Sequence, residues 1–421
     1  MFIIHVLGIS EDCPTLISLG NSLKMGITNA GIMTQLNTNC CSATGVICTA
    51  SGNPKVSALY WNNLGLTGTF RNTIFANMTS LTTIRFTGNS ITGSLPIDLP
   101  QSVLEVSMGS NRLNGTIPST WPNALTSLSV YTNLLTGQIP TTLPASLTFL
   151  NVGTNQLSGS IPVLPLNLLV LRADNNRFSG SLPSLWPIGL TDLIIYSNSI
   201  IGPLPSTFPS SMTSLNVGSN QLNGTIPTLP SNLSLLHLDR GSFSGLLPAD
   251  FPRNVISLRL GRNAGLYGDV TNIITANVQY LWLGDKLGNY GTAFTGSLTI
   301  AKPIELFIDS NSITDIQVAD TSSLSGSCDI SYNPLLSNPN ISNLASCIKN
   351  GLFTLSTAQI AISTSLIVKK AIQTSTIPLT NDLAVVDSTT FIDITGLSSD
   401  TVSSSPTFTS TESIQSTSSL T

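Results

Sequence analysis

Apolar residues recur along the middle of the chain in a short block that repeats about every 22 positions. The block SVLEVSMGSNRLNGTIPSTWP at 102–122 returns as ALTSLSVYTNLLTGQIPTTLP at 124–144 and as SLTFLNVGTNQLSGSIPVLP at 146–165. Within each block the pattern LxxLxV, as in Leu147, Leu150 and Val152, predicts a short strand whose apolar side chains point inward. A repeat of this length predicts a solenoid, in which each turn buries its apolar face against its neighbours.

Polar residues and prolines keep the same period. An asparagine after each strand can bury its amide and bond to backbone groups of adjoining turns. Glycine permits the tight turn that follows, and two prolines per turn keep the back of the turn extended and exclude a helix there. Asparagines occur at 89, 111, 133, 155, 176, 198, 220 and 263, with Gly241 in the one vacant slot; the glycines are at 93, 115, 137, 159, 180, 202, 224 and 245.

The combined pattern LxxLxVxxNxLxGxIP resembles the plant-type leucine-rich repeat, a family that includes receptor-kinase ectodomains and polygalacturonase-inhibiting proteins. The resemblance covers about residues 12–348. It implies an α/β-type leucine-rich repeat solenoid, mostly β: a right-handed curved superhelix with a parallel concave sheet, a Pro-rich convex side with little helix, and cysteine-bridged caps. The units here have 21 or 22 residues, which is short for the family's usual ~24, because the back of each turn is reduced to a Pro-rich link.

Six cysteines lie in two groups, one before and one after the repeats. An even number in this arrangement indicates disulfides formed in an oxidising compartment; zinc is a poorer interpretation because there is no CxxC pair and no nearby histidine. The resemblance implies the pairs Cys13–Cys40 and Cys41–Cys48, and Cys328–Cys347 would close the other end. We therefore expect an N-terminal cap over 12–55, repeats over 56–325 and a C-terminal cap over 326–348.

The two ends of the chain differ from the repeats. Residues 1–11 are interpreted as the remnant of a signal peptide, with a disordered or packed N-terminal strand as the alternative. Residues 349–421 are expected to be a disordered tail; sixteen of the last 24 residues are Ser or Thr, which is typical of an O-glycosylated stalk or of unglycosylated disorder. Leu352–Val368 is a candidate membrane span, but its Ser and Thr content favours a marginal strand or linker.

Charged residues make up only 9% of the chain, and the net charge is -4. This composition excludes the basic surface that nucleic-acid binding requires, so a soluble surface must depend on Ser, Thr and Asn, with added sugar. If the chain is secreted, five Asn-x-Ser/Thr sequons become candidate glycosylation sites, at Asn77, Asn114, Asn223, Asn232 and Asn340.

Side chains alternate along a strand, so the residue between two inward residues, and the residue two positions later, face outward on the concave side. The first set, here the central column, is Arg85, Ser107, Ser129, Asn151, Arg172, Ile194, Asn216, His237, Arg259, Trp282 and Phe307. The second, the trailing column, is Thr87, Gly109, Tyr131, Gly153, Asp174, Tyr196, Gly218, Asp239 and Gly261.

Charged and aromatic residues are scarce in the chain but gather on this predicted surface, together with Arg240 and Arg262. Tyr, Trp and Arg are enriched at binding hot spots. The alternative is that the few polar side chains are merely exposed there. The candidate ligand-binding residues are Tyr131, Arg172, Asp174, Tyr196, His237, Asp239, Arg259 and Trp282.

Catalysis is not indicated. His237, Asp239 and Ser242 could be written as a hydrolase trio, but the first two project from one strand and nothing suggests an oriented base or an oxyanion hole. No phosphate-binding loop, cofactor motif or histidine-rich metal site is present in the sequence.

We therefore expect an extracellular recognition module, secreted or at the cell surface or wall, that binds a protein, peptide or wall polysaccharide and is attached to a membrane only through an anchor at or beyond the C-terminus. A structural wall glycoprotein and an inhibitor of secreted wall-degrading enzymes are the alternatives.

Overall fold

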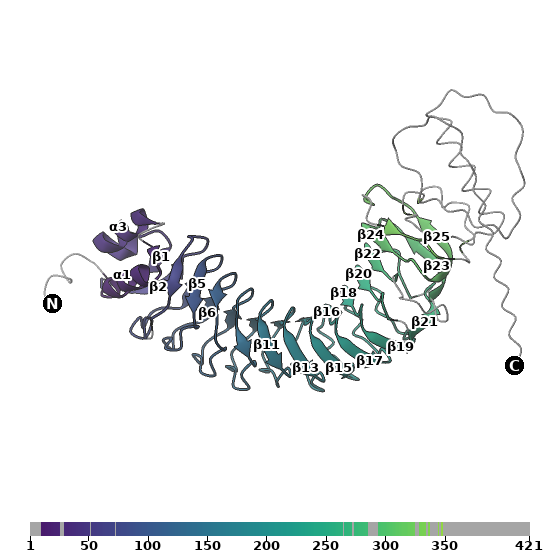
Figure 1. Cartoon of the computed structure of the whole chain (residues 1–421), viewed down its shortest axis with the longest axis horizontal. Helices are drawn as coiled ribbons and strands as arrows, with labels where there is room; N and C mark the ends of the chain where they lie inside the picture. The colour runs from purple at the N-terminus through teal and green to yellow at the C-terminus, as the bar shows by residue number, and fades with distance from the viewer. Residues whose placement is uncertain are drawn as a thin grey trace, which may run out of the picture.

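The computed structural model of the chain describes residues 10–25, 29–50, 52–71, 73–263, 265–271, 273–284, 294–324, 328–333, 336, 344 and 347. Figure 1 shows these residues as an arc, with two helices at its N-terminal end and stacked strands along its length. The sequon Asn340, the segment Leu352–Val368 and the Ser/Thr-rich tail lie outside the described residues.

The inner side of the arc is a fourteen-stranded sheet, the concave sheet (Figure 1). All neighbouring strands in it are parallel except β1 and β2. Each three-residue strand of this sheet between residues 83 and 307 buries its middle residue, as Leu150 and Leu171 show, because both neighbours in the strand point away from the core. The strands are β1 (Val46–Cys48), β2 (Val56–Tyr60), β4 (Thr83–Arg85), β6 (Glu105–Ser107), β8 (Ser127–Ser129), β10 (Phe149–Asn151), β12 (Val170–Arg172), β14 (Asp192–Ile194), β16 (Ser214–Asn216), β18 (Leu235–His237), β20 (Ser257–Arg259), β22 (Tyr280–Trp282), β24 (Glu305–Phe307) and β26 (Cys328–Asp329).

The outer side of the arc carries a second, nine-stranded sheet, which the sequence did not predict. Most of its strands follow the repeated asparagine of a turn, although the strand that begins at Ser242 follows Gly241. Several end at or beyond a glycine that the sequence pattern assigned to a tight turn. Gly159, for example, has a φ of +79° and is the last residue of its strand. The strands are β9 (Thr136–Gly137), β11 (Gln156–Gly159), β13 (Arg177–Gly180), β15 (Ser199–Pro203), β17 (Gln221–Gly224), β19 (Ser242–Leu246), β21 (Gly265–Asp269), β23 (Phe294–Ile300) and β25 (Ser312–Val318); β3 (Thr67–Thr69), β5 (Ser90–Gly93) and β7 (Arg112–Leu113) form a further three-stranded sheet.

The buried asparagines form the predicted ladder between turns. Asn133 is typical: its Nδ2 donates to the carbonyl oxygens of Met108, Val130 and Tyr131 at 3.0–3.1 Å, and its Oδ1 accepts from the backbone N–H of Leu113 at 2.9 Å. One amide thus connects two successive turns and satisfies backbone groups that the sheets leave unpaired. At Gly241 the ladder has no side chain, and it resumes at Asn263.

The N-terminal cap contains two helices that the sequence did not predict, α1 (Cys13–Ser22) and α3 (Ala30–Asn39), followed by a 3₁₀ turn, η2 (Cys40–Ser42). The helices pack closely, since a Cβ atom at Gly20 would lie 2.6 Å from the Sδ atom of Met33. The Oδ2 atom of Asp12 accepts from the backbone N–H of Val56 at 2.8 Å, which connects the cap to the first parallel strand pair.

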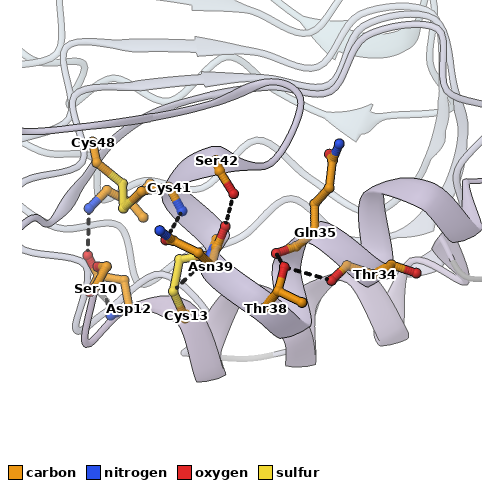
Figure 2. The surroundings of a disulfide bond; sticks show 12 residues. Ser10, Asp12, Cys13, Thr34, Gln35, Thr38, Asn39, Cys41, Ser42 and Cys48 are labelled. Carbon is orange, nitrogen blue, oxygen red and sulfur yellow. Dashed lines mark hydrogen bonds between the residues drawn. A yellow bond between two sulfur atoms is a disulfide. The ribbon is translucent and has the colours of Figure 1, made fainter. Parts of the chain in front are cut away.

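All six cysteines are paired: Cys13–Cys40 and Cys41–Cys48 in the N-terminal cap, and Cys328–Cys347 at the other end. These are the pairs that the family resemblance and the sequence implied. Figure 2 shows the first cap, where Asn39 Oδ1 accepts from the backbone N–H of Cys41 at 3.1 Å beside the two bridges. Between Ala43 and Leu324 the described residues contain no helix, so the back of each turn is extended as predicted.

Candidate functional site: the concave sheet

The structure places the whole predicted central column in one line across the concave sheet. The strand register pairs Arg85 with Ser107 and continues turn by turn to Trp282 and Phe307. Tyr60 precedes this line and Asp329 follows it. Eleven positions chosen from the alternation of apolar residues therefore occupy equivalent places on one continuous surface.

A third column, which the sequence analysis missed, lies on the other side of the central one. It is made by the first residue of each strand, and it includes Phe149, Val170 and Asp192, all partly exposed. The alternation of side chains along a strand requires this residue to face outward as well. It could therefore have been predicted from the sequence, as the residue directly before the first of the two inward residues. We call it the leading column: Thr83, Glu105, Ser127, Phe149, Val170, Asp192, Ser214, Leu235, Ser257, Tyr280 and Glu305.

Near the N-terminal end of the concave sheet, Arg85 is held between two partners. Its Nε and Nη2 atoms donate to the Glu105 carboxylate at 2.6 and 2.8 Å, and its guanidinium lies 5.3 Å from the ring centroid of Tyr60. The Glu105 contact raises the pKa of Arg85 above its ordinary value. The charges of Arg85 and Glu105 are thus paired with each other. None of these three residues was among the candidate ligand-binding residues.

At the centre of the sheet, polar side chains of adjacent turns form a short network. Asn175 Nδ2 donates to Asp174 Oδ2 at 2.9 Å and to the hydroxyl of Tyr196 at 3.2 Å. Asn175 itself has a left-handed backbone with a φ of +51°, a conformation that asparagine tolerates better than most residues. The structure thus brings two candidates, Asp174 and Tyr196, together through a residue that the sequence analysis did not consider.

Tyr131 lies one turn beyond Gly109 in the trailing column, and its ring occupies the space that a Cβ atom at Gly109 would need. The side chain is partly exposed. Arg172 is exposed on β12 in the central column, between Asn151 and Ile194. Both candidates are therefore accessible from the concave side.

Toward the C-terminal end, two arginines gather around one indole. The guanidinium groups of Arg240 and Arg259 each lie 5.3 Å from the Trp282 ring, a separation at which cation–π attraction operates. Arg259 Nη2 also donates to Glu305 Oε2 at 3.3 Å, while its Nε is buried without a hydrogen-bond partner in the described structure. Trp282 in turn packs against Phe307, with ring centroids 6.1 Å apart.

His237 and Asp239 differ from the sequence expectation, because both are buried rather than exposed. Nε2 of His237 is hydrogen-bonded to Ser257 Oγ at 2.7 Å, and burial, with the nearby charge of Arg259, lowers the pKa of His237 from 6.5 to about 4. Burial raises the pKa of Asp239, although the charges of Arg259, Arg240 and Arg262 act against this rise. Neighbouring turns cover these two residues, which sequence alternation alone does not reveal.

The hydrolase trio considered from the sequence is not assembled. Ser242 begins β19 in the outer sheet, whereas His237 ends β18 in the concave sheet and bonds to Ser257 instead. In the described ranges, no group of three or more His, Cys, Asp or Glu side chains is arranged to hold a metal ion. None of the helices described there is long and apolar enough to cross a bilayer.

No protein-family model matches the chain, and no curated protein matches it in sequence. Among solved structures, it is similar to the ectodomain of the plant receptor kinase GASSHO1/SCHENGEN3 from Arabidopsis thaliana in complex with CASPARIAN STRIP INTEGRITY FACTOR 2. The TM-score is 0.62 at 24% identity, over 80% of this chain and 46% of that chain.

Two further solved structures show the same likeness. The Arabidopsis HAESA ectodomain in complex with an extended IDA peptide hormone has a TM-score of 0.56 at 22% identity, over 80% of this chain and 63% of that chain. The PEPR1–AtPEP1 structure has a TM-score of 0.50 at 22% identity, over 73% and 51%. The chain thus spans less than two thirds of the length of each ectodomain, and the likeness shows that it has the leucine-rich repeat fold.

Proposed function

We propose that this leucine-rich repeat solenoid is an extracellular recognition module that holds a protein, peptide or polysaccharide ligand across its concave sheet. The observation that carries the proposal is the central column. Charged and aromatic side chains are rare in the chain, yet Arg172, Trp282 and their neighbours occupy equivalent positions on one uninterrupted sheet. An extended ligand could contact many of these positions at once.

Several features of the structure support an extracellular location. Three disulfides in the described residues favour an oxidising environment. The similar solved structures are ectodomains of receptor kinases, and the HAESA ectodomain is in complex with a peptide hormone. Asn77, Asn114, Asn223 and Asn232 are exposed, and none belongs to a strand of the concave sheet. Glycans at these four sites would leave the concave sheet accessible.

The experiment compares two matched pairs of substitutions. Arg172→Ala with Tyr196→Ala alters the concave sheet, whereas Arg177→Ala with Tyr267→Ala makes the same chemical change on β13 and β21 of the outer sheet. Interferometry against immobilised wall proteins, peptides and polysaccharide fractions measures the affinity of each. We expect the concave pair to weaken the wild-type interaction at least tenfold and the outer pair to leave it within twofold. Equal effects of the two pairs would refute concave recognition.

A structural wall glycoprotein is the second candidate, and the exposed sequons favour it. In that case the chain would remain in the detergent-insoluble wall fraction, and the concave pair would not change its retention. A soluble, ligand-dependent distribution supports recognition instead.

A further inference from the structure

Two turns of the solenoid have the same five-residue sequence apart from one methyl group: NVGTN at 151–155 and NVGSN at 216–220. In both turns the asparagine ends a concave strand, in the central column, and the glycine is in the trailing column. The register places Arg172 and Ile194 between Asn151 and Asn216. The two asparagines are therefore three strand steps apart, or roughly 14 Å at ~4.8 Å per step.

Each asparagine is fixed in the same orientation. Oδ1 of Asn151 accepts from the backbone N–H of Gly153 at 3.2 Å, and Oδ1 of Asn216 accepts from Gly218 at 3.3 Å. No other hydrogen bond of either side chain occurs within the described ranges. Because the carbonyl end of the amide is held by the backbone, the NH₂ group is left as an oriented donor on the partly exposed concave sheet.

A carboxylate from the next turn lies over the glycine to which each amide is hydrogen-bonded. A Cβ atom at Gly153 would be 2.7 Å from Asp174 Oδ1, and a Cβ atom at Gly218 would be 2.7 Å from Asp239 Oδ1. Asn and Asp therefore lie beside the same glycine, and each pair presents an amide NH₂ donor and a carboxylate acceptor. A single hydroxyl group can accept from the first and donate to the second, whereas a peptide N–H or C=O can do only one of the two.

The surface around the first of these arrangements, Asn151 with Asp174, is almost uncharged, whereas Asp239 of the second lies near Arg240, Arg259 and Arg262. Between residues 113 and 236 the charged residues are Arg172, Asp174, Arg177 and Asp192, and Arg177 belongs to the outer sheet. Partly exposed apolar side chains of Phe149, Val170 and Ile194 adjoin the amides. At the first arrangement, a hydroxyl-binding pair beside aromatic and aliphatic surface, with little charge, matches a neutral sugar polymer better than an acidic polymer or a charged peptide.

We propose that β10–β18 and the turns that follow them form a binding site for a neutral linear polysaccharide, with Asn151–Asp174 and Asn216–Asp239 as two subsites of similar geometry. The proposal rests on the concave recognition proposed above and names its ligand class. The first subsite is the more open, because Asp174 is partly exposed whereas Asp239 is buried near three arginines. A short oligosaccharide binds at the first subsite, and a longer one bridges both and gains affinity through its second contact.

The test uses neutral hexasaccharides and disaccharides of glucose, mannose and xylose as probes, with an oligogalacturonide and unmodified peptides for comparison. Asn151→Asp and Asn216→Asp retain an acceptor for the glycine N–H but remove the donor, so they test the NH₂ group rather than the turn. Asn123→Ala, in an exposed turn outside the concave sheet, is the control. Isothermal titration measures each affinity, and circular dichroism checks that each variant is folded.

We expect one neutral hexasaccharide to bind at least tenfold more tightly than its disaccharide. Each Asp variant should reduce hexasaccharide affinity at least tenfold, only Asn151→Asp should weaken the disaccharide, and Asn123→Ala should stay within twofold. Equal affinity for both lengths, or no effect of either Asp variant, would overturn the proposal.

The panel also separates this inference from the broader function. If a peptide or the oligogalacturonide binds instead, and Arg172→Ala with Tyr196→Ala abolishes that binding, concave recognition stands and the neutral polysaccharide is refuted. If no probe is sensitive to the concave pair, both proposals fail.

Discussion

The carboxylate of Asp174 lies over the α-carbon of Gly153 in the preceding turn, so that a Cβ atom there would be 2.7 Å from its Oδ1. Asp239 has the same relationship to Gly218, and Tyr131 and Asp309 similarly occupy the space beside Gly109 and Gly284. None of these glycines has a positive φ. They are required for space, and side chains of the trailing column lean toward the N-terminal neighbour because that space is empty.

Gly153→Ala should therefore displace Asp174 while leaving the fold intact. A Cβ–oxygen distance of 2.7 Å is too short to persist, and the partly exposed carboxylate can move away at a cost of about 1 kcal/mol or less. We expect ligand affinity to fall several-fold with the thermal midpoint nearly unchanged. Titration calorimetry and thermal unfolding of the same sample measure the two effects.

Gly31→Ala is the matched control, since a Cβ atom at Gly31 meets nothing within 4 Å. Gly31 lies in α3, so alanine should stabilise the cap by about 0.5–1 kcal/mol without altering affinity. An unchanged affinity of Gly153→Ala would show that the position of Asp174 does not matter for binding.

Asn133→Ala should be strongly destabilising. It removes three donated bonds and one accepted bond at a buried site, which leaves backbone groups of two turns unpaired and costs about 3 kcal/mol or more. Urea unfolding of the full chain measures this change. The exposed Asn123→Ala should alter stability by less than about 0.5 kcal/mol. Similar values for the two variants would contradict the claim that the buried asparagines stabilise the fold.

The 22-residue period was sufficient to predict the asparagine ladder and the central column, because both depend on positions that repeat identically in every turn. The outer sheet was missed because its strands are short and end near glycines such as Gly159, which a sequence analysis assigns to turns. The helices α1 and α3 lie outside the repeat, so its period carries no information about them.

The repeat pattern also could not predict contacts between side chains that occupy different positions in neighbouring turns. Asn175 joins Asp174 to Tyr196, and Ser257 meets His237, because particular side chains lean across a turn boundary. The burial of His237 has the same origin: alternation assigns a residue to a face but does not determine how much its neighbours cover.

His237 should make the protein less stable in mild acid. Its pKa is about 4 in the folded state, below the ordinary 6.5, so the unfolded chain binds more protons between these values. The contribution of neutral His237 to the free energy of unfolding is complete above about pH 6.5 and is lost as the pH falls toward 4. Between pH 7 and 5 the loss is on the order of 2 kcal/mol. Asp239, whose pKa is raised by burial, changes stability in the opposite direction on acidification.

Urea unfolding at pH 7 and pH 5 isolates the histidine when wild type is compared with His237→Gln. Glutamine does not titrate, so the variant should lose less stability than wild type over this interval. Identical pH dependence would mean that His237 is not the responsible group.

Removing the Cys13–Cys40 bridge should destabilise the N-terminal cap. The bridge joins residues separated by 27 positions, and closing such a loop contributes about 3.5 kcal/mol in the chain-entropy model. Cys13→Ser with Cys40→Ser should therefore lower the thermal midpoint more than Cys41→Ser with Cys48→Ser, whose separation is only 7. An equal or reversed order would indicate that native packing rather than loop length sets the effect.

Site-specific photo-crosslinking tests concave recognition most directly. A photoreactive side chain replaces Tyr196 on the concave sheet or Tyr267 on the outer sheet, and each protein is irradiated with the ligand that wild type binds. The concave position should capture the ligand, in competition with unlabelled ligand, while the outer position should capture none. Competable capture at Tyr267 with none at Tyr196 would contradict the account.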